Sequence, residues 1–306
     1  MKILVTGASG FLGRHLTKKL KSKGHKVYEI STKNCDLTIQ KSLNELFKNI
    51  IFDQIYHLAA WTQVGDFRLH QLGKQWILNQ KINTNVLSWW KDSQPQAKLV
   101  CIGTSASYVS ELELKEENYL KGEPIENWAT YVQIKRTLYI GLQAINNQFG
   151  LNYMYFVPST LYGPDYIYLK EKQLPFIFDL IRKILRGKIH GEEVVLWGDG
   201  YQNREIVYVN DFVNIMIGLN KRLSNKIINI GAGEGHNIRY FAKKICNIVG
   251  YDFKKIKFDE TKPTGAKSKC LDISSFEKVL PNYPFKDLDE CLKETIDWMK
   301  QSVWVD

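Results

Sequence analysis

A tyrosine and a lysine stand four residues apart in the segment YVQIK, as Tyr131 and Lys135. If the segment is helical, both side chains project from one face. A phenol whose pKa is near 10 transfers a proton poorly at neutral pH, and a neighbouring ammonium group favours the phenolate and makes the proton easier to transfer. The spacing is thus suited to acid–base chemistry, although by itself it is more typical of a partly buried aromatic residue beside a surface lysine.

Hydroxyl residues stand at the end of a strand-like run upstream, KLVCIG at 98–103. Thr104 or Ser105 at that end is suited to hydrogen-bond a substrate carbonyl and to orient the phenol. The simpler interpretation of these residues is strand-end polarity.

Three glycines, Gly7, Gly10 and Gly13, separate the first apolar run from a helical pattern. Gly7 permits a tight turn, Gly10 the close approach of a pyrophosphate, and Gly13 packing of the helix on the strand. The helix would then present unpaired N–H groups to the phosphates. A glycine-rich turn without a ligand is the alternative. The order of glycine turn, hydroxyl strand end and YxxxK is more specific than any one part and favours a dinucleotide site.

The end of the second predicted strand bears on the choice of cofactor. NAD sites usually carry Asp or Glu there, to bind the ribose 2′-hydroxyl. Here Ser31 takes that place, followed by Thr32 and Lys33, and hydroxyls with a cation suit a 2′-phosphate. We therefore predict NADPH. Two alternatives stay open, because Glu29 shares a face with Ser31 and Lys33 is also typical of a solvated loop.

Strand-like and helical segments alternate over the first half of the chain. The strand-like runs are 2–6, 26–30, 54–59, 98–103 and 152–157, with a further one at 226–233, and the helical segments are 11–24, 37–49, 74–90 and 131–150. Gly24 and Gly150 close the first and the last of these helices and are predicted to be left-handed caps. This alternation predicts an α/β fold, a Rossmann-type doubly wound parallel sheet. Prolines and glycines interrupt the pattern after Val157, which predicts a smaller, discontinuous α/β cap over the carboxyl edge of the sheet, where such folds bind substrates. We assign residues 1–160 plus about 206–230 to the dinucleotide-binding domain, and about 161–205 plus 231–306 to the substrate-binding domain.

The composition limits the classes of function. A chain of 306 residues with 44% apolar and 24% charged residues can bury a sizeable core. The net charge of +10 fits lysine-rich solvated faces or attraction of phosphorylated ligands, and the basic clusters lack the aromatic residues of a nucleic-acid site. No apolar run is long enough for a membrane span, and Met1 leads directly into a strand. Five scattered cysteines without a CxxC pair predict a cytoplasmic protein with no disulfides and no metal site.

Several motifs together resemble the extended short-chain dehydrogenase/reductase family: TGASGFLG, HLAA, GTSASY, YVQIK and PSTLYGP. The resemblance implies hydride transfer at a sugar carbon. Thr104 would be the catalytic hydroxyl, Tyr131 the acid/base, and Lys135 the group that tunes Tyr131 and binds the nicotinamide ribose. The cofactor would contact the following residues: Gly7, Ser9, Gly10, Phe11, Leu12, Gly13, Ser31, Thr32, Lys33, Asp36, Leu37, Leu58, Ala59, Ala60, Tyr131, Lys135 and Pro158.

Within that family, WGxGxxxRE at 197–205 and KPTGAKSKCLD at 262–272 resemble the GDP-L-fucose synthase subfamily of 3,5-epimerase/4-reductases. The resemblance implies a GDP-linked 4-keto sugar, with Arg204 and Lys269 on its diphosphate. For Arg204 a salt bridge with a neighbouring acid, Glu205 or Asp199, is the alternative. The implied substrate-binding residues are Ser105, Ala106, Thr160, Trp197, Arg204 and Lys269.

Two positions depart from the subfamily's acid/base pair for epimerisation. Ala106 stands where the subfamily has a cysteine, and Lys172 stands near its histidine. Alanine cannot move a proton, and an exposed lysine is protonated at neutral pH. We therefore expect NADPH-dependent C4 reduction without epimerase activity. This resembles the separate C4 reductases of GDP-4-keto-6-deoxy-heptose in pathways to bacterial surface polysaccharides.

Three other functions remain as alternatives: a bifunctional epimerase/reductase that uses Cys101, His190 or Lys172, an NAD-dependent nucleotide-sugar 4-epimerase, and a non-catalytic dinucleotide sensor. The resemblance also implies a homodimer, formed by a four-helix bundle from segments 74–90 and 131–145. Burial of these segments within the monomer is the alternative, and Trp89, Trp90 and Tyr139 are candidate reporters.

Overall fold

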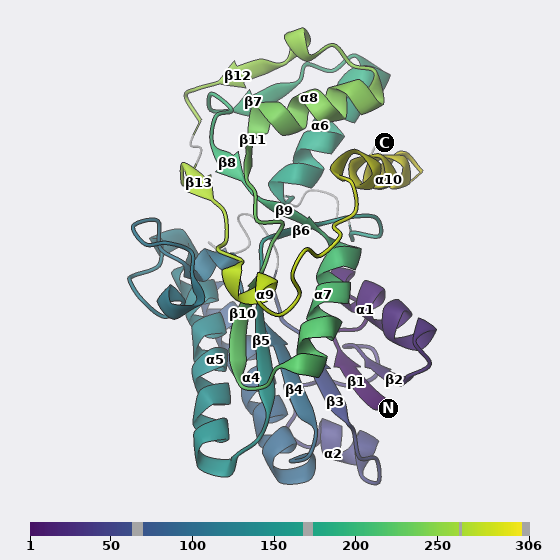
Figure 1. Ribbon diagram of the computed structural model, residues 1–306, viewed down its shortest axis with the longest axis vertical. Helices are drawn as coiled ribbons and strands as arrows, with labels where there is room; N and C mark the ends of the chain where they lie inside the picture. The colour runs from purple at the N-terminus through teal and green to yellow at the C-terminus, as the bar shows by residue number, and fades with distance from the viewer. Residues whose placement is uncertain (63–69, 168–173, 263–264, 302–306) are drawn as a thin grey trace.

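A six-stranded parallel sheet forms the centre of the computed structural model, which describes residues 1–62, 70–167, 174–262 and 265–301 (Figure 1). The strand order is β10-β5-β4-β3-β1-β2, and every neighbouring pair runs parallel. The strands are β1 Lys2–Thr6, β2 Lys26–Ile30, β3 Gln54–His57, β4 Lys98–Ile102, β5 Tyr153–Pro158 and β10 Lys226–Ile230. These are the runs predicted as strands from the sequence, and the Rossmann-type sheet is confirmed.

Helices cover both faces of this sheet, as a doubly wound fold requires. Helices α1 (Phe11–Ser22) and α7 (Val209–Arg222) pack together, as do α4 (Leu72–Ser93) and α5 (Ala129–Phe149). Because all six strands run in the same direction, their carboxyl ends lie at one edge of the sheet, beneath the cap (Figure 1). Residues far apart in the sequence are therefore brought together there.

The cap has its own apolar cluster, separate from the cluster around the sheet. Its largest elements are three helices, α6 Phe176–His190, α8 Ile238–Val249 and α10 Leu288–Lys300. Three small sheets accompany them: β11-β8-β13, β12-β7 and β6-β9. Their strands are β6 Thr160–Tyr162, β7 Val195–Trp197, β8 Asn203–Arg204, β9 Ile206–Tyr208, β11 His236–Asn237, β12 Lys257–Asp259 and β13 Ser268–Lys269. Most of these strands were not predicted, since two or three residues show no periodicity. The domain boundaries stay a prediction.

Local chemistry explains where the helices end. Gly24 follows α1 and Gly150 follows α5, both with positive φ (+76° and +73°), as predicted for left-handed caps. Helix α2 (Ser42–Phe47) is shorter than the predicted helical segment 37–49. Its expected first turn is replaced by a turn in which Asp36 Oδ1 accepts hydrogen bonds from the backbone and the hydroxyl of Thr38. The remaining helical turns are η1 Ser105–Ser107, η2 Glu116–Asn118, η3 Glu126–Trp128, η4 Phe253–Lys255 and α9 Ser274–Glu277.

Cysteines and acidic residues are dispersed in this fold. All five cysteines are free thiols. Over the described ranges, no three His, Cys, Asp or Glu side chains gather as a metal site would require. Over the same ranges, no helix combines the length and the apolarity of a bilayer span.

Candidate active site

Two of the three predicted catalytic residues, Lys135 and Thr104, lie at the carboxyl end of β4. Lys135 Nζ donates a hydrogen bond to the Ile102 carbonyl at 2.9 Å, so the amine lies at the strand end that leads into Thr104. Thr104 Oγ1 accepts a hydrogen bond from the Ala106 backbone N–H at 3.2 Å and thereby caps the turn η1. Because the threonine oxygen accepts that bond, its hydroxyl proton can be donated to a substrate oxygen.

Tyr131 lies near the start of α5, one helical turn before Lys135 and on the same face, as predicted. Its half-buried ring meets Trp128 edge to face, with ring centroids 6.4 Å apart. Lys269 Nζ lies over the other aromatic ring of this pair, 5.4 Å from the Trp128 centroid. Lys269 in turn is the register partner of Arg204 in the β8–β13 pair. The cap therefore brings Lys269 over the ring that contacts the predicted acid/base, with Arg204 on the neighbouring strand.

A chain of buried hydroxyls connects the Thr104 turn to α5. The Thr104 N–H donates to Tyr119 Oη at 3.4 Å, the Tyr119 and Tyr155 hydroxyls are 3.0 Å apart, and Tyr155 donates to the Lys135 carbonyl at 2.8 Å. Burial raises the pKa of Tyr119 to about 12 and that of Tyr155 well above its ordinary value, so both stay protonated and act as hydrogen-bond links. A Cβ on Gly103 would lie 2.6 Å from the Tyr155 ring, so only glycine allows this packing.

Arg136 provides a second link between α5 and the Thr104 loop. Its buried guanidinium donates to three backbone carbonyls, those of Ser107 (2.6 Å), Lys121 (2.8 Å) and Gly122 (2.8 Å). Burial lowers the pKa of this group. Sequence reasoning missed both Arg136 and the tyrosine chain. Arginine beside Lys135 is the only signal the sequence offers, and nothing in it indicates which carbonyls the side chain reaches.

The glycine turn has the geometry that a dinucleotide pyrophosphate requires. Gly7 has a φ of +66°, and a Cβ there would lie 2.8 Å from the Ala59 nitrogen. A Cβ on Gly13 would lie 2.2 Å from the Gly7 carbonyl oxygen, so this glycine allows α1 to pack on the turn. Gly10 is the N-cap of α1 and supplies no side-chain cap, which leaves backbone N–H groups for an anion. These residues fit a bound dinucleotide.

The floor of this turn is a closed hydrogen-bond network. Thr6 Oγ1 accepts from the Leu58 and Ala59 backbone N–H groups, both at 3.1 Å, and lies 2.9 Å from His57 Nδ1. The other ring nitrogen of His57 is 3.1 Å from Asn83 Oδ1. Burial lowers the pKa of His57 to about 4, so the ring is neutral. His57 therefore holds the turn to the neighbouring strand and is not a candidate proton donor.

The loop after β2 contains the residues predicted to select NADPH over NADH. Thr32 and Lys33 are exposed, and the Ser31 backbone N–H donates to Asn34 Oδ1 at 2.8 Å, which shapes the turn. The carboxylate of Glu29 forms an ion pair with Lys21 of α1. Glu29 is thus engaged by a cation of its own, which favours the hydroxyl-and-lysine interpretation of this loop.

The other predicted cofactor residues form two groups: side chains that have a packing or turn role within the protein, and residues at the carboxyl edge of the sheet. Leu37 is buried and Asp36 caps the turn at Thr38, so their side chains have packing and turn roles. The ring of Phe11 contacts His15 of α1 and, in the cap, Tyr166 and Phe178, so the ring packs against protein. The second group lies along the carboxyl edge of the sheet and comprises Ser9, Leu12, Leu58, Ala59, Ala60 and Pro158.

The predicted substrate residues lie in the cap and at the sheet edge. Arg204 Nη1 donates to the Asn203 carbonyl at 2.7 Å and to the Ala266 carbonyl at 2.8 Å, which orients the guanidinium across β8 and the segment before β13. Thr160 begins β6, and its N–H donates to the Glu205 carbonyl at 3.4 Å. Ser105 and Ala106 are half-buried in η1, next to Thr104.

The carboxylate of Glu205 is buried and turned toward the backbone. It accepts from the N–H groups of Gly233 at 2.8 Å and Leu271 at 3.0 Å, and a Cβ on Gly231 would lie 2.2 Å from it. Burial raises the pKa of Glu205 from 4.5 to about 7 despite these donors. The carboxylate that sequence analysis paired with Arg204 thus joins the end of β10 to the segment before α9.

This pKa predicts a pH dependence of stability. The folded protein holds the Glu205 proton more tightly than the unfolded chain, so the free energy of unfolding should fall as pH rises from about 4.5 to about 7. The change should be up to about 3 kcal/mol, at about 1.4 kcal/mol per unit of pKa. Glu205→Gln should remove this slope and lower stability near pH 4.5, where wild-type Glu205 is protonated, since one backbone donor loses its acceptor. Denaturant titrations between pH 4.5 and 8 test this; an unchanged slope in the variant would contradict it.

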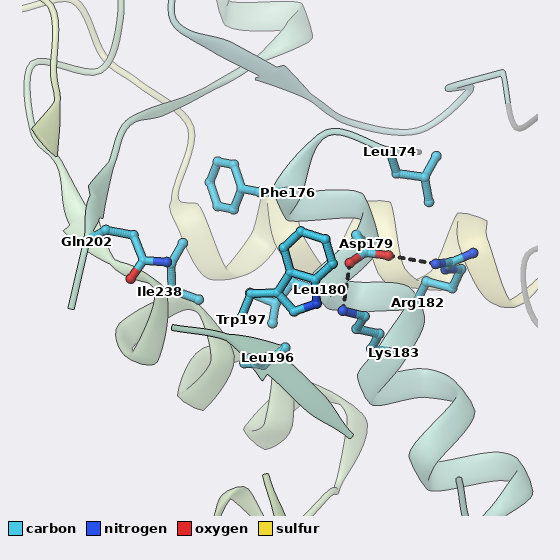
Figure 2. Close-up of a pocket in the computed structure, with 10 residues that line it drawn as sticks. All are labelled: Leu174, Phe176, Asp179, Leu180, Arg182, Lys183, Leu196, Trp197, Gln202 and Ile238. Carbon is cyan, nitrogen blue, oxygen red and sulfur yellow. Dashed lines mark hydrogen bonds and ion pairs between the residues drawn. The ribbon is translucent and has the colours of Figure 1, made fainter. Parts of the chain in front are cut away.

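A cavity of about 550 Å³ lies in the cap, between the first half of α6 and β7 (Figure 2). The indole of Trp197, which is 52% exposed, forms one side, and Asp179 lies between Arg182 and Lys183 on the other. The lining is otherwise mostly apolar and comprises Leu174, Phe176, Leu180, Leu196, Gln202 and Ile238. The cavity is therefore suited to a flat group with a polar edge.

Comparison with known proteins agrees with this geometry. The model of the NAD dependent epimerase/dehydratase family matches residues 3–231. The chain belongs to this family. It is 29% identical to GDP-L-colitose synthase of Yersinia pseudotuberculosis over 89% of each chain. It is also 29% identical to GDP-L-fucose synthase 1 of Arabidopsis thaliana, over 99% of this chain and 94% of that one.

The fold of this epimerase/dehydratase family member matches solved structures closely. A GDP-6-OMe-4-keto-L-xylo-heptose reductase from C. jejuni superimposes with a TM-score of 0.86, at 21% identity, over 98% of this chain and 97% of that chain. At this identity the match establishes the architecture, and the chemistry has to be argued from the site.

Two of the three residues considered as substitutes for the epimerisation pair, Cys101 and His190, lie in the described part of the chain, in different elements. Cys101 is completely buried in β4, and burial raises the pKa of its thiol to about 12. His190 lies exposed in the last turn of α6, whereas the cavity is lined by the first half of that helix. Lys172 lies outside the described residues. Neither Cys101 nor His190 is therefore situated to take a proton from a substrate at the Thr104 edge.

Proposed function

We propose that this protein is an NADPH-dependent reductase that acts at C4 of a GDP-linked 4-keto-6-deoxy sugar, hexose or heptose, without epimerase activity. The observation that carries the proposal is the anchoring of Lys135 to the end of β4 beside Thr104, with Tyr131 one turn away on the same helix face. The glycine turn supports the dinucleotide, and the names of the relatives support a GDP-sugar.

The proposed reaction assigns one task to each of the three residues. When bound, NADPH supplies the hydride that reaches C4. Tyr131 donates its proton to the carbonyl oxygen of the substrate, and the Thr104 hydroxyl hydrogen-bonds that oxygen. Lys135 stabilises the phenolate left on Tyr131 and also binds the nicotinamide ribose. Because its amine is already held by the Ile102 carbonyl, little side-chain freedom is lost when the substrate binds.

The cap supplies charge for the other end of the substrate. Arg204 and Lys269 are register partners on adjacent strands, so both cations can face one diphosphate. Lys269 also lies over Trp128, which contacts Tyr131. A diphosphate held by these cations would leave its sugar directed toward Tyr131.

Loss of epimerase activity follows from the turn that holds Thr104. Ala106 has no proton to give or take, and its backbone N–H is used by Thr104 Oγ1. The test is turnover of GDP-4-keto-6-deoxymannose and its heptose counterpart in D₂O with NADPH. We expect NADPH oxidation and a product with no deuterium at C3 or C5. Deuterium at either carbon would mean that a different acid/base pair performs epimerisation, and would disprove the reductase-only proposal.

Lys33 supports the preference for NADPH, because an exposed cation after β2 can bind a 2′-phosphate. For Lys33→Glu we expect the KM for NADPH to rise at least about tenfold, with little change in the KM for NADH, since each 1.4 kcal/mol lost is a factor of ten. Lys48→Glu, at an exposed position after α2, is the matched control for the change in net charge. Equal effects on both cofactors would rule out this role for Lys33.

We further propose a cytoplasmic homodimer that forms through α4 and α5. Trp76 and Ile77 of α4 and Ile140 of α5 are 41–54% exposed and fit a helical bundle between two subunits. Trp89, Trp90 and Tyr139, considered earlier as reporters, are buried within the protomer. Light scattering should give twice the monomer mass, and Ile140→Lys should give the monomer mass; a wild-type monomer would contradict the proposal.

A further inference from the structure

Asp179 is the one carboxylate among the side chains that line the 550 Å³ cavity in the described part of the cap. It lies in the first turn of α6 and is 30% exposed. Oδ1 accepts from Arg182 Nη2 at 2.7 Å, and Oδ2 forms an ion pair with Lys183 Nζ at 3.1 Å (Figure 2). Each oxygen keeps a lone pair for a further donor, and the two ion pairs fix the orientation of the carboxylate.

We propose that this cavity holds the nucleotide base of the substrate and that Asp179 selects guanine. This inference rests on the proposed function, in which the substrate is a GDP-sugar. Guanine presents two neighbouring donors on one edge, N1–H and the N2 amino group, which match the two oxygens of a carboxylate. Uracil and thymine present one N–H between two carbonyl oxygens, and those oxygens would be repelled by Asp179. Adenine and cytosine each present one donor beside an unprotonated ring nitrogen.

The walls of the cavity fit the faces of a purine. Trp197 offers an exposed indole for stacking, and Leu180, Leu196 and Ile238 provide apolar contacts. Gln202 also lines the cavity, and it lies two residues before Arg204. Two residues span at most about 7 Å, so the cavity lies next to the cations assigned to the diphosphate.

The charges in the cavity argue against a diphosphate in the same place. Arg182 and Lys183 both engage Asp179, and a phosphate placed there would face its carboxylate. Arg204 is instead oriented by the backbone carbonyls of Asn203 and Ala266, and it is the register partner of Lys269 on the neighbouring strand. Base and diphosphate thus have separate sites along one path.

The test compares GDP with inosine diphosphate, which lacks the N2 amino group and is otherwise identical. Titration calorimetry on the full-length protein should show inosine diphosphate binding about tenfold more weakly than GDP, as expected for the loss of one hydrogen bond to a charged group. UDP should bind more weakly still. In Asp179→Asn this discrimination should fall to about twofold or less. The ratio of the two dissociation constants is the readout, because a change in overall charge affects both ligands equally.

Glu192→Gln is the matched control, since it also converts a carboxylate to an amide, in the ion pair with Arg186 near the end of the same helix, and Glu192 does not line the cavity. It should retain the tenfold ratio. A ratio near one in the wild type, an unchanged ratio in Asp179→Asn, or an equal loss of discrimination in Glu192→Gln would each overturn the inference. Nucleotide binding does not require turnover, so absence of NADPH oxidation would count against the proposed function while leaving this result intact.

Discussion

Replacement of Tyr131 with phenylalanine should lower kcat by about 10³-fold, within the range typical of a lost general acid. The ring and its contact with Trp128 would remain, so the dissociation constants for NADPH and for the nucleotide should change less than about threefold. The measurement is NADPH oxidation under saturating substrate, combined with calorimetric binding of each ligand. The split between kcat and binding is the signature of a group that acts only on the reacting oxygen.

Tyr28→Phe is the control for this prediction. It also removes a phenolic hydroxyl, but from β2 at the edge of the sheet, where its ring packs edge to face on Phe52 with centroids 5.2 Å apart. We expect unchanged kcat in that variant. If Tyr131→Phe kept more than a tenth of the wild-type kcat, Tyr131 would not be the proton donor, and the proposed reduction would need a different acid.

Introduction of one methyl group at Gly13 should be the most damaging change outside the catalytic residues. The new Cβ would lie 2.2 Å from the Gly7 carbonyl and 2.8 Å from Ala8 Cα, and both contacts are with backbone that cannot rotate away. The turn has to shift away from α1, which alters the surface on which the pyrophosphate would lie. We expect Gly13→Ala to weaken NADPH binding at least about 100-fold and to lower the free energy of unfolding by about 2–4 kcal/mol.

Gly73→Ala is the control that distinguishes a steric clash at Gly13 from a general effect of replacing a helical glycine with alanine. Gly73 is near the start of α4, and a Cβ there meets nothing within 4 Å. Alanine at that position should leave NADPH binding unchanged and raise stability by up to about 1 kcal/mol. Calorimetry and denaturant titration measure both variants. Wild-type NADPH affinity in Gly13→Ala would show that the turn does not form the pyrophosphate site.

Much of the fold could be predicted from the sequence because its signals are local. Each central strand is a short apolar run, and β1 leads directly into three glycines, each of which allows a close backbone approach. The YxxxK spacing by itself places Tyr131 and Lys135 on one helix face, because a helix turn is 3.6 residues. These features depend on neighbours a few residues away, so the sequence by itself determined them.

The supports of the site depend on contacts between distant segments and were decided only by the tertiary structure. Arg136 reaches carbonyls 14 to 29 positions away, and Tyr155 of β5 donates to the Lys135 carbonyl of α5, 20 positions away. Asp179 and Trp197 line one cavity, between α6 and β7, although the sequence motifs assigned only Trp197 to the substrate. A hydrogen bond or a cavity wall needs a partner at a given distance, and packing, which no local pattern encodes, brings that partner into place.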